Sequence, residues 1–193
     1  AISGSGVVIK NGSNALSFTA DQSYTGATVV NAGSLLVGTG GTTGTLASSL
    51  IGLPFASANL TLNRSDNLTL SNLIRGTGTF QKAGSNTLTL TGSSQNAVFT
   101  IDGGSLIAQT NTPTTTIAGS TYNGPGSLVI QPTGTSFSAA YSPSGMTFNN
   151  TLGGLTIGKT TNTVGITLSN TIDISGPVSV YGGSIAVNSA IKS

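Results

Sequence analysis

Short runs of alternating apolar and polar residues recur along the chain, and Gly and Asn separate them. The first run is Val7–Lys10, which is followed by a turn at Asn11–Asn14 and a second run at Ala15–Thr19. A period of two is typical of β-strands with one buried face, and Gly and Asn favour tight turns. No segment of ten residues carries the 3.6-residue apolar period of a capped helix. The pattern therefore predicts an all-β chain of short strands.

These runs belong to a layout that occurs three times. The first two copies are identical at 8 of 16 positions over residues 4–19 and 76–91, and the first and third are identical at 5 of 12 positions over their later strands. Long unlike intervals separate the copies, which span about 4–38, 76–109 and 153–188. We interpret residues 1–193 as one continuous domain that contains three copies of a repeat.

The recurrence favours a parallel β-solenoid, because stacked repeats place equivalent residues in equivalent surroundings. A β-sandwich is the alternative, with longer strands and a sequence that does not recur. At about 20 residues a turn, one copy would make nearly two turns. Alternation across the copies predicts burial of six residues: Leu16, Phe18, Leu88, Leu90, Ile166 and Leu168. Ser17, Thr89 and Thr167 are then expected on the opposite face.

Three glycines occupy the same place in the three copies. Gly33, Gly104 and Gly183 each precede an equivalent apolar run. We expect them to share a backbone conformation with positive φ, which a Cβ atom disfavours. They are predicted to be structural turn residues.

Charge is scarce in this sequence. Charged residues make up 5% of the chain and the net charge is +2, whereas a typical soluble domain has about 25% charged residues. We expect no nucleic-acid partner, because the sequence has no cluster of Lys and Arg residues that could displace the counterions of a nucleic acid. His and Cys are absent, so we expect no metal site and no cofactor. No run of about 18 apolar residues predicts a membrane span in this segment.

Two stretches carry a family resemblance. NALSFTADQSYTGATVVNAGSLLVG (14–38) resembles the passenger-associated repeat of bacterial autotransporters, and NTLTLTGSSQNAVFTIDGGSLIA (86–108) resembles it without the YTG. Residues 154–189, with the core GPVSVYGGSIAVN, are similar to repeats of filamentous-haemagglutinin-like surface adhesins. The resemblance implies a right-handed parallel β-helix that holds an adhesive or effector region away from an outer membrane. It also implies an extracellular location at the bacterial surface, and it carries over no catalytic residue.

Candidate chemistry in the sequence is weak. Many β-helices are polysaccharide enzymes, but these need paired or clustered carboxylates, or a calcium site with a basic residue nearby. The aspartates here are far apart in the sequence, and Asp21 and Asp102 are the most plausible pair. We therefore expect no enzyme activity. Lys10, Lys82 and Lys159 are equivalent in the three copies and are weak candidates for surface contact, as a ladder for acidic glycans. The alternative is that each lysine is a solvated charge at a strand end, where it blocks edge pairing.

The sequence thus predicts a structural stalk or adhesive segment of a surface adhesin. Its expected partners are other cell or substrate surfaces, including glycans. Alternative functions are a binding module for polysaccharide or ice, the latter from Thr-rich runs such as Thr87–Thr91 and Thr114–Thr116, and a filament subunit that assembles end to end. Neither terminus carries the polar or charged cap of natural solenoids. We expect each end to be continued, by further chain or by a neighbouring copy.

Overall fold

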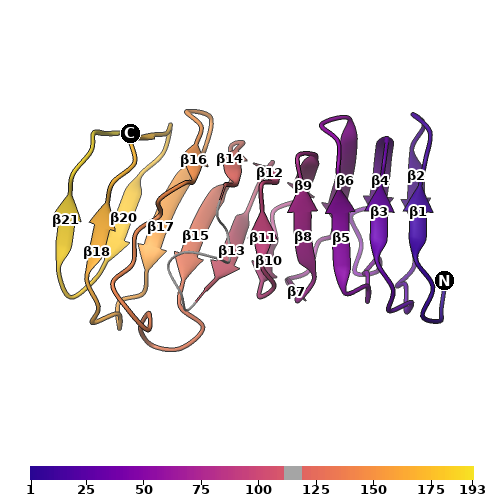
Figure 1. Cartoon of the computed structure of the whole chain (residues 1–193), viewed down its shortest axis with the longest axis horizontal. Coiled ribbons are helices and arrows are strands. Elements are labelled where there is room, and N and C mark those ends of the chain that lie inside the picture. The colour runs from indigo at the N-terminus through magenta and orange to yellow at the C-terminus, as the bar shows by residue number, and fades with distance from the viewer. Residues whose placement is uncertain (111–118) are drawn as a thin grey trace.

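The computed structural model describes residues 1–110 and 119–193, which form a parallel β-solenoid of about eight turns (Figure 1). The turns succeed one another along the long axis, and the two termini lie at its opposite ends. No described residue is helical, and so no helix in this part of the chain could cross a membrane. The predicted solenoid is confirmed, and the β-sandwich alternative is wrong.

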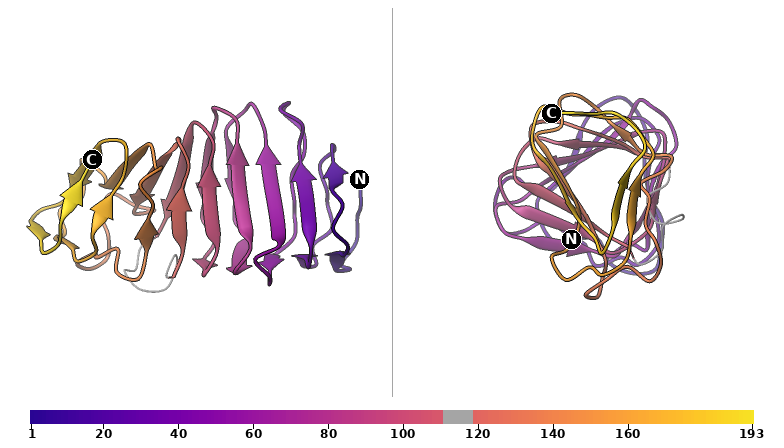
Figure 2. Two further views of the ribbon diagram at one scale, coloured as in Figure 1. Left: turned by 90° about the horizontal axis from the view of Figure 1, so that it is seen from above. Right: turned by 90° about the vertical axis from the view of Figure 1, so that its left-hand side faces the viewer.

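The coil has three faces, each a parallel sheet, and an end-on view outlines the three sides (Figure 2). The first face contains β1 (Val8–Lys10), β3 (Thr28–Val30), β5 (Leu50–Leu53), β8 (Leu73–Gly76) and β11 (Ser94–Gln95). The second contains β2 (Leu16–Phe18), β4 (Gly33–Val37), β6 (Ala58–Asn63), β9 (Thr79–Ala83), β12 (Val98–Ile101), β14 (Thr121–Asn123) and β16 (Thr147–Phe148). The third contains β7 (Leu68–Leu70), β10 (Thr87–Leu90), β13 (Ser105–Gln109), β15 (Ser127–Gln131), β17 (Gly154–Gly158) and β20 (Val178–Tyr181).

The last turns continue the same cycle in two short sheets. Between β17 and β20 of the third face, the chain passes through β18 (Ile166–Leu168) and then β19 (Ile172–Asp173). Each of these pairs with a strand one turn later, β18 with β21 (Ile185–Val187) and β19 with β22 (Ile191–Lys192). By their place in the cycle, β18 and β21 belong to the first face, and β19 and β22 belong to the second.

Columns of like residues form the core. On the third face, Leu68, Leu88 and Leu106 are neighbours in register, and Leu128 and Leu155 continue the column. On the second face an aromatic column runs through Phe80, Phe99, Tyr122 and Phe148, with ring centroids 5.7, 5.2 and 6.3 Å apart. Full burial of such a side chain is worth about 1.5–3 kcal/mol. The inward side chains of each turn therefore pack against those of the turn before and the turn after, except in the first and last turns.

The three repeat copies do not stack on one another. The second copy begins at β9 on the second face, three turns and one face after β1 on the first. The third begins at β17 on the third face, again three turns and one face later. Each copy occupies five successive strand places, or one and two-thirds turns, which agrees with the predicted length. Equivalent residues of the three copies therefore lie on three different sides of the solenoid.

Five of the six burial predictions are confirmed. Phe18, Leu88, Leu90, Ile166 and Leu168 are buried, whereas Leu16 is 39% exposed. Leu16 points into the same column as the fully buried Leu35 of the next turn. It is exposed because β2 lies in the first turn, and no described strand covers its other side. Ser17 is exposed, and Thr89 and Thr167 are partly exposed.

Candidate functional site at the corners of the solenoid

The Lys82 side chain points into the corner between the second and third faces and is only 1% exposed. Its Nζ donates hydrogen bonds to the carbonyl oxygens of Gly84 (2.7 Å) and Gly103 (2.7 Å) and to Oδ1 of Asn86 (3.0 Å). Gly84 lies in the same turn as Lys82, and Gly103 lies in the next turn. The ammonium therefore joins two turns where the strand ladder is interrupted. Burial lowers the pKa of Lys82, and nearby Asp102 opposes this shift.

Lys10 makes the same arrangement at the corner between the first and second faces. Its Nζ donates to the carbonyl oxygens of Gly12 (2.6 Å) and Asn11 (3.0 Å) in its own turn and of Ala32 (3.0 Å) in the next turn. Gly12 and Ala32 are the residues that align with Gly84 and Gly103 of the second copy. We call this set of carbonyls around a buried lysine the amine cage.

The third copy replaces the lysine of the cage with an asparagine. Lys159 is only half-buried, and its Nζ donates to the carbonyl oxygen of Gly134 (2.9 Å). Gly158, with φ +88°, ends β17 just before it, so the Lys159 side chain no longer follows the strand alternation. Asn162 is buried instead, and its Nδ2 donates to the carbonyl oxygens of Val164 (3.1 Å) and Tyr181 (2.9 Å), which lie in its own and the next turn.

These contacts correct both interpretations of the three lysines. Lys10 and Lys82 are buried, so neither is a surface-contact residue or a solvated strand end. They also lie at different corners, and Lys159 follows a strand of the third face, so no ladder for acidic glycans exists. In each copy, one buried polar side chain joins two successive turns at a different corner: Lys10, Lys82 and Asn162.

The predicted turn glycines lie at the same three corners, in the turn that follows each of these side chains. Gly33 and Gly104 have φ of +68° and +62° as predicted, but Gly183 does not have positive φ. All three nevertheless pack against the backbone of the preceding turn. A Cβ atom would lie 2.5 Å from the Ser13 carbonyl oxygen at Gly33, 2.3 Å from that of Asn86 at Gly104 and 2.0 Å from that of Thr163 at Gly183. The shared requirement is close packing between turns, and positive φ accompanies it in two copies.

Arg64 is a further corner residue that the sequence analysis missed. It is 5% exposed and lies one turn before Lys82, at the same corner. Its guanidinium donates to the carbonyl oxygens of Thr42 and Gly44 in the preceding turn. It also makes a bidentate contact with Asp66, at 2.8 and 2.7 Å. The hydrogen bond from Arg64 lowers the pKa of Asp66. An Arg-x-Asp motif directly after a strand was the available signal.

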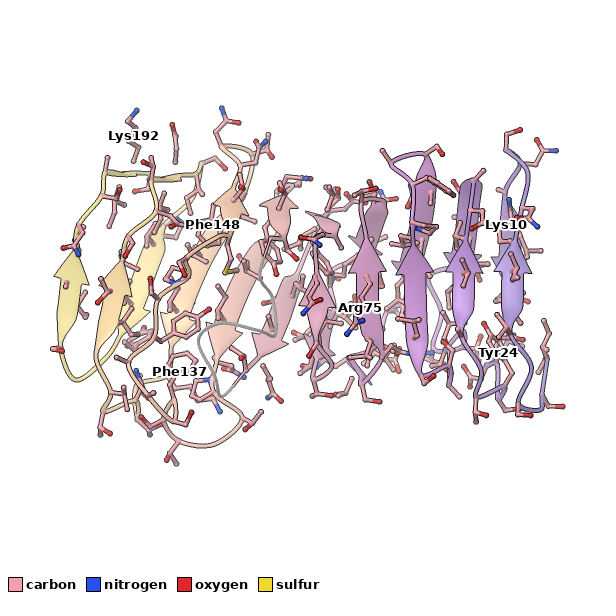
Figure 3. All side chains as sticks on the ribbon, viewed as in Figure 1. Lys10, Tyr24, Arg75, Phe137, Phe148 and Lys192 are labelled. Carbon is pink, nitrogen blue, oxygen red and sulfur yellow. The ribbon has the colours of Figure 1, made fainter. Side chains whose placement is uncertain are left out.

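The outward surfaces of the sheets are largely uncharged. On the third face the outward column reads Thr69, Thr89, Ile107, Val129, Thr156 and Ser179. Ile and Val interrupt this column, so it is not the regular threonine array that ice binding would need. Ser17, Thr89 and Thr167 lie on three different faces, and Thr114–Thr116 falls outside the described residues. Arg75 is an exposed exception that projects from β8 on the first face (Figure 3).

No arrangement suited to catalysis is found among the described residues. Asp21 and Asp102 follow β2 and β12, which are four strand positions apart on the second face. At about 4.8 Å per strand they are roughly 19 Å apart along the axis, so they do not form the carboxylate pair considered above. Asp21 lies 3.6 Å from Arg64 instead. The described part of the chain has no pocket and no group of three or more metal-ligating side chains.

Two segments of the chain match a known family of repeats. The family model described as passenger-associated-transport-repeat matches residues 8–37 and 80–108, which confirms the resemblance of the first two copies. Each matched segment includes the lysine of an amine cage, Lys10 or Lys82, and the packed glycine at the same corner in the next turn, Gly33 or Gly104. The third copy lies outside both matches. Neither a curated protein nor a solved structure matches the chain.

Proposed function

We propose that this chain is a structural and adhesive stalk segment of an autotransporter passenger, exposed at the bacterial surface, without catalytic activity. The observation that carries the proposal is the stacking of about eight parallel turns, with side chains that join successive turns at all three corners. At about 4.8 Å per turn, the segment adds roughly 40 Å of length. The two matches to the passenger repeat support the assignment to a passenger.

The uncharged faces suit contact with surfaces rather than binding of one small ligand. Thr, Ser and Asn side chains offer donors and acceptors along each face, and few charges on this surface favour or oppose a partner through long-range electrostatics. We propose other cells and substrate surfaces as partners. On other cells, surface glycans would be the molecules contacted.

Surface display tests this proposal directly. The chain would be placed between an N-terminal epitope tag and an autotransporter translocator domain, and produced in a bacterium that does not adhere. We expect the tag to be accessible on intact cells, and the cells to attach to surfaces or to one another more than cells with the tagged translocator alone. A tag that is exported but attachment equal to the control would remove the adhesive role and leave the spacer role. Failure to reach the surface would contradict the proposal as a whole.

A further inference from the structure

Arg75 differs from the other charged side chains in having no partner within the described part of the chain. Ten side chains are charged, six Lys or Arg and four Asp, and the other nine make a hydrogen bond or an ion pair. Asp102, for example, accepts a hydrogen bond from Nε2 of Gln81 at 2.6 Å. No contact of this kind with the described residues holds the Arg75 guanidinium, which is exposed about midway along the solenoid (Figure 3). It is therefore available to an external anion.

The outward residues around Arg75 form a flat apolar surface on the first face. Arg75 of β8 lies in register with Gly52 of β5, and Gly52 lies in register with Val29 of β3. Gly52 has no side chain, and a Cβ atom there would make only ordinary contacts, the nearest at 3.6 Å from Val29. The partly exposed Leu50 and Leu73 are also neighbours in register, and they lie on the same outward side because each is two residues before Gly52 or Arg75. We call these five residues the Arg75 patch.

An exposed aromatic ring lies at the corner beside this patch. Phe55 is 56% exposed and follows Pro54, the first residue after β5. Thr77, two residues after Arg75, donates a hydrogen bond from its Oγ1 to the Pro54 carbonyl oxygen at 3.2 Å. At about 3.3 Å per residue and 4.8 Å between strands, the backbones of Arg75 and Phe55 are roughly 10 Å apart. A short run of sugar units can cover this distance.

We infer that the Arg75 patch binds a carboxylate-bearing sugar of an acidic polysaccharide, and that Phe55 contacts a neighbouring unit of the same polymer. This inference rests on the proposed function, because it names the class of glycan that the stalk contacts. Arginine has a planar fork of donors that matches a carboxylate bidentately. The apolar C–H face of the sugar ring would lie over Leu50 and Leu73. A flat face without a pocket in the described part of the chain suits an extended polymer, which can lie across it and continue past it on both sides.

Other anionic partners fit the Arg75 patch less well. A second copy of the chain offers no free aspartate, because all four already make hydrogen bonds or ion pairs. A nucleic acid or an anionic membrane is bound through several cations, whereas this patch has one. One guanidinium matches the single carboxylate of one sugar unit. The contact is weak when it is made once, and many copies of the stalk on one cell would strengthen it by multivalency.

The test is binding of the purified chain to immobilised polygalacturonate, a polymer of carboxylated sugars, in buffer without divalent cations. The matched ligand is the methyl-esterified polymer, which keeps the sugar ring but loses the charge, and we expect binding to the acid form alone. Arg75→Gln should weaken binding about tenfold or more, and Arg75→Lys should retain only part of it, because Lys lacks the fork. Phe55→Ala should weaken binding as well. Lys159→Gln is the matched control, because it also removes one positive charge but follows a strand of the third face.

Circular dichroism and a cooperative unfolding transition would show that each variant is folded. The inference is overturned if the folded wild-type chain does not bind polygalacturonate, or if it binds the esterified polymer equally well. It is also overturned if Arg75→Gln or Phe55→Ala leaves binding unchanged, or if Lys159→Gln weakens binding as much as Arg75→Gln does. Surface display separates this result from the proposed function. Cells that display the chain and attach, while the chain does not bind polygalacturonate, would overturn this inference and leave the proposed function in place.

Discussion

Lys10 and Lys82 bind equivalent backbone carbonyls, yet they lie at different corners of the solenoid. Each donates to the second residue after itself, Gly12 or Gly84, and to a residue of the next turn, Ala32 or Gly103. The two copies share these contacts because the contacts involve only residues of a single corner. The same contacts can therefore form at any of the three corners. The repeat is therefore a unit that joins two turns, and three such units join all three corners.

The first prediction concerns the amine cage. Lys82→Met keeps much of the side-chain volume but leaves the Gly84 and Gly103 carbonyls and the Asn86 amide oxygen without their donor. Buried groups that lose a charged partner cost about 2–4 kcal/mol, and we expect this loss in the free energy of unfolding measured with urea. Lys159→Met is the matched control and should change it by less than about 0.5 kcal/mol. If Lys82→Met changed the free energy of unfolding no more than Lys159→Met does, the amine cage would not contribute to stability.

The second prediction separates packing from backbone conformation. Gly183 lacks positive φ, but a Cβ atom there would lie 2.0 Å from the Thr163 carbonyl oxygen. Gly183→Ala should therefore lower the melting temperature, with a free-energy cost of about 1–3 kcal/mol. Gly134→Ala is the control, because no atom lies within 4 Å of the added Cβ. If only Gly104→Ala, at φ +62°, were destabilising, backbone conformation rather than packing would be the requirement.

The third prediction concerns the aromatic column of the second face. Phe99 is fully buried, with its ring between those of Phe80 and Tyr122 at 5.7 and 5.2 Å. Phe99→Ala removes both ring contacts and leaves a cavity, so we expect a loss of about 3–5 kcal/mol in the free energy of unfolding. Phe55→Ala, at a residue 56% exposed, should be almost neutral in the same denaturation experiment. A small effect at Phe99 would mean that neighbouring turns close the cavity.

The fourth prediction concerns acid. The hydrogen bond from Arg64 lowers the folded-state pKa of Asp66 below its unfolded value of about 3.9. The stabilisation is therefore present above the unfolded pKa and is lost as pH falls through the folded-state pKa. We expect the melting temperature to decrease when the pH is lowered below about 4, and we expect Asp66→Asn to make the melting temperature less dependent on pH in this range. Asp173→Asn is the control, because the Asp173–Lys192 pair at 3.9 Å is exposed. If Asp66→Asn left the decrease of the melting temperature at low pH unchanged, the Arg64–Asp66 contact would not be its cause.

The local alternation of the sequence was sufficient to predict that the chain forms strands, and which apolar residues of the aligned runs face inward. Leu88, Leu90, Ile166 and Leu168 are buried as expected, because a strand places successive side chains on opposite faces wherever it packs. Recurrence of the layout was sufficient to predict stacking, since equivalent residues need equivalent surroundings. The match of the first two copies to the passenger-associated-transport-repeat model also followed from residues that lie close together in the sequence.

Only the tertiary structure decided which residues meet across turns. Successive turns take from 18 residues, between Thr87 and Ser105, to 27, between Ser127 and Gly154, because corner loops vary in length. The repeat offset of 72 residues therefore becomes three turns and one face, a result that depends on the sum of all intervening loops. For the same reason, the burial of Lys10, the outward position of Lys159 and the exposure of Leu16 could not be predicted from alternation. Each depends on what lies in the adjacent turn, and local sequence does not specify that neighbour.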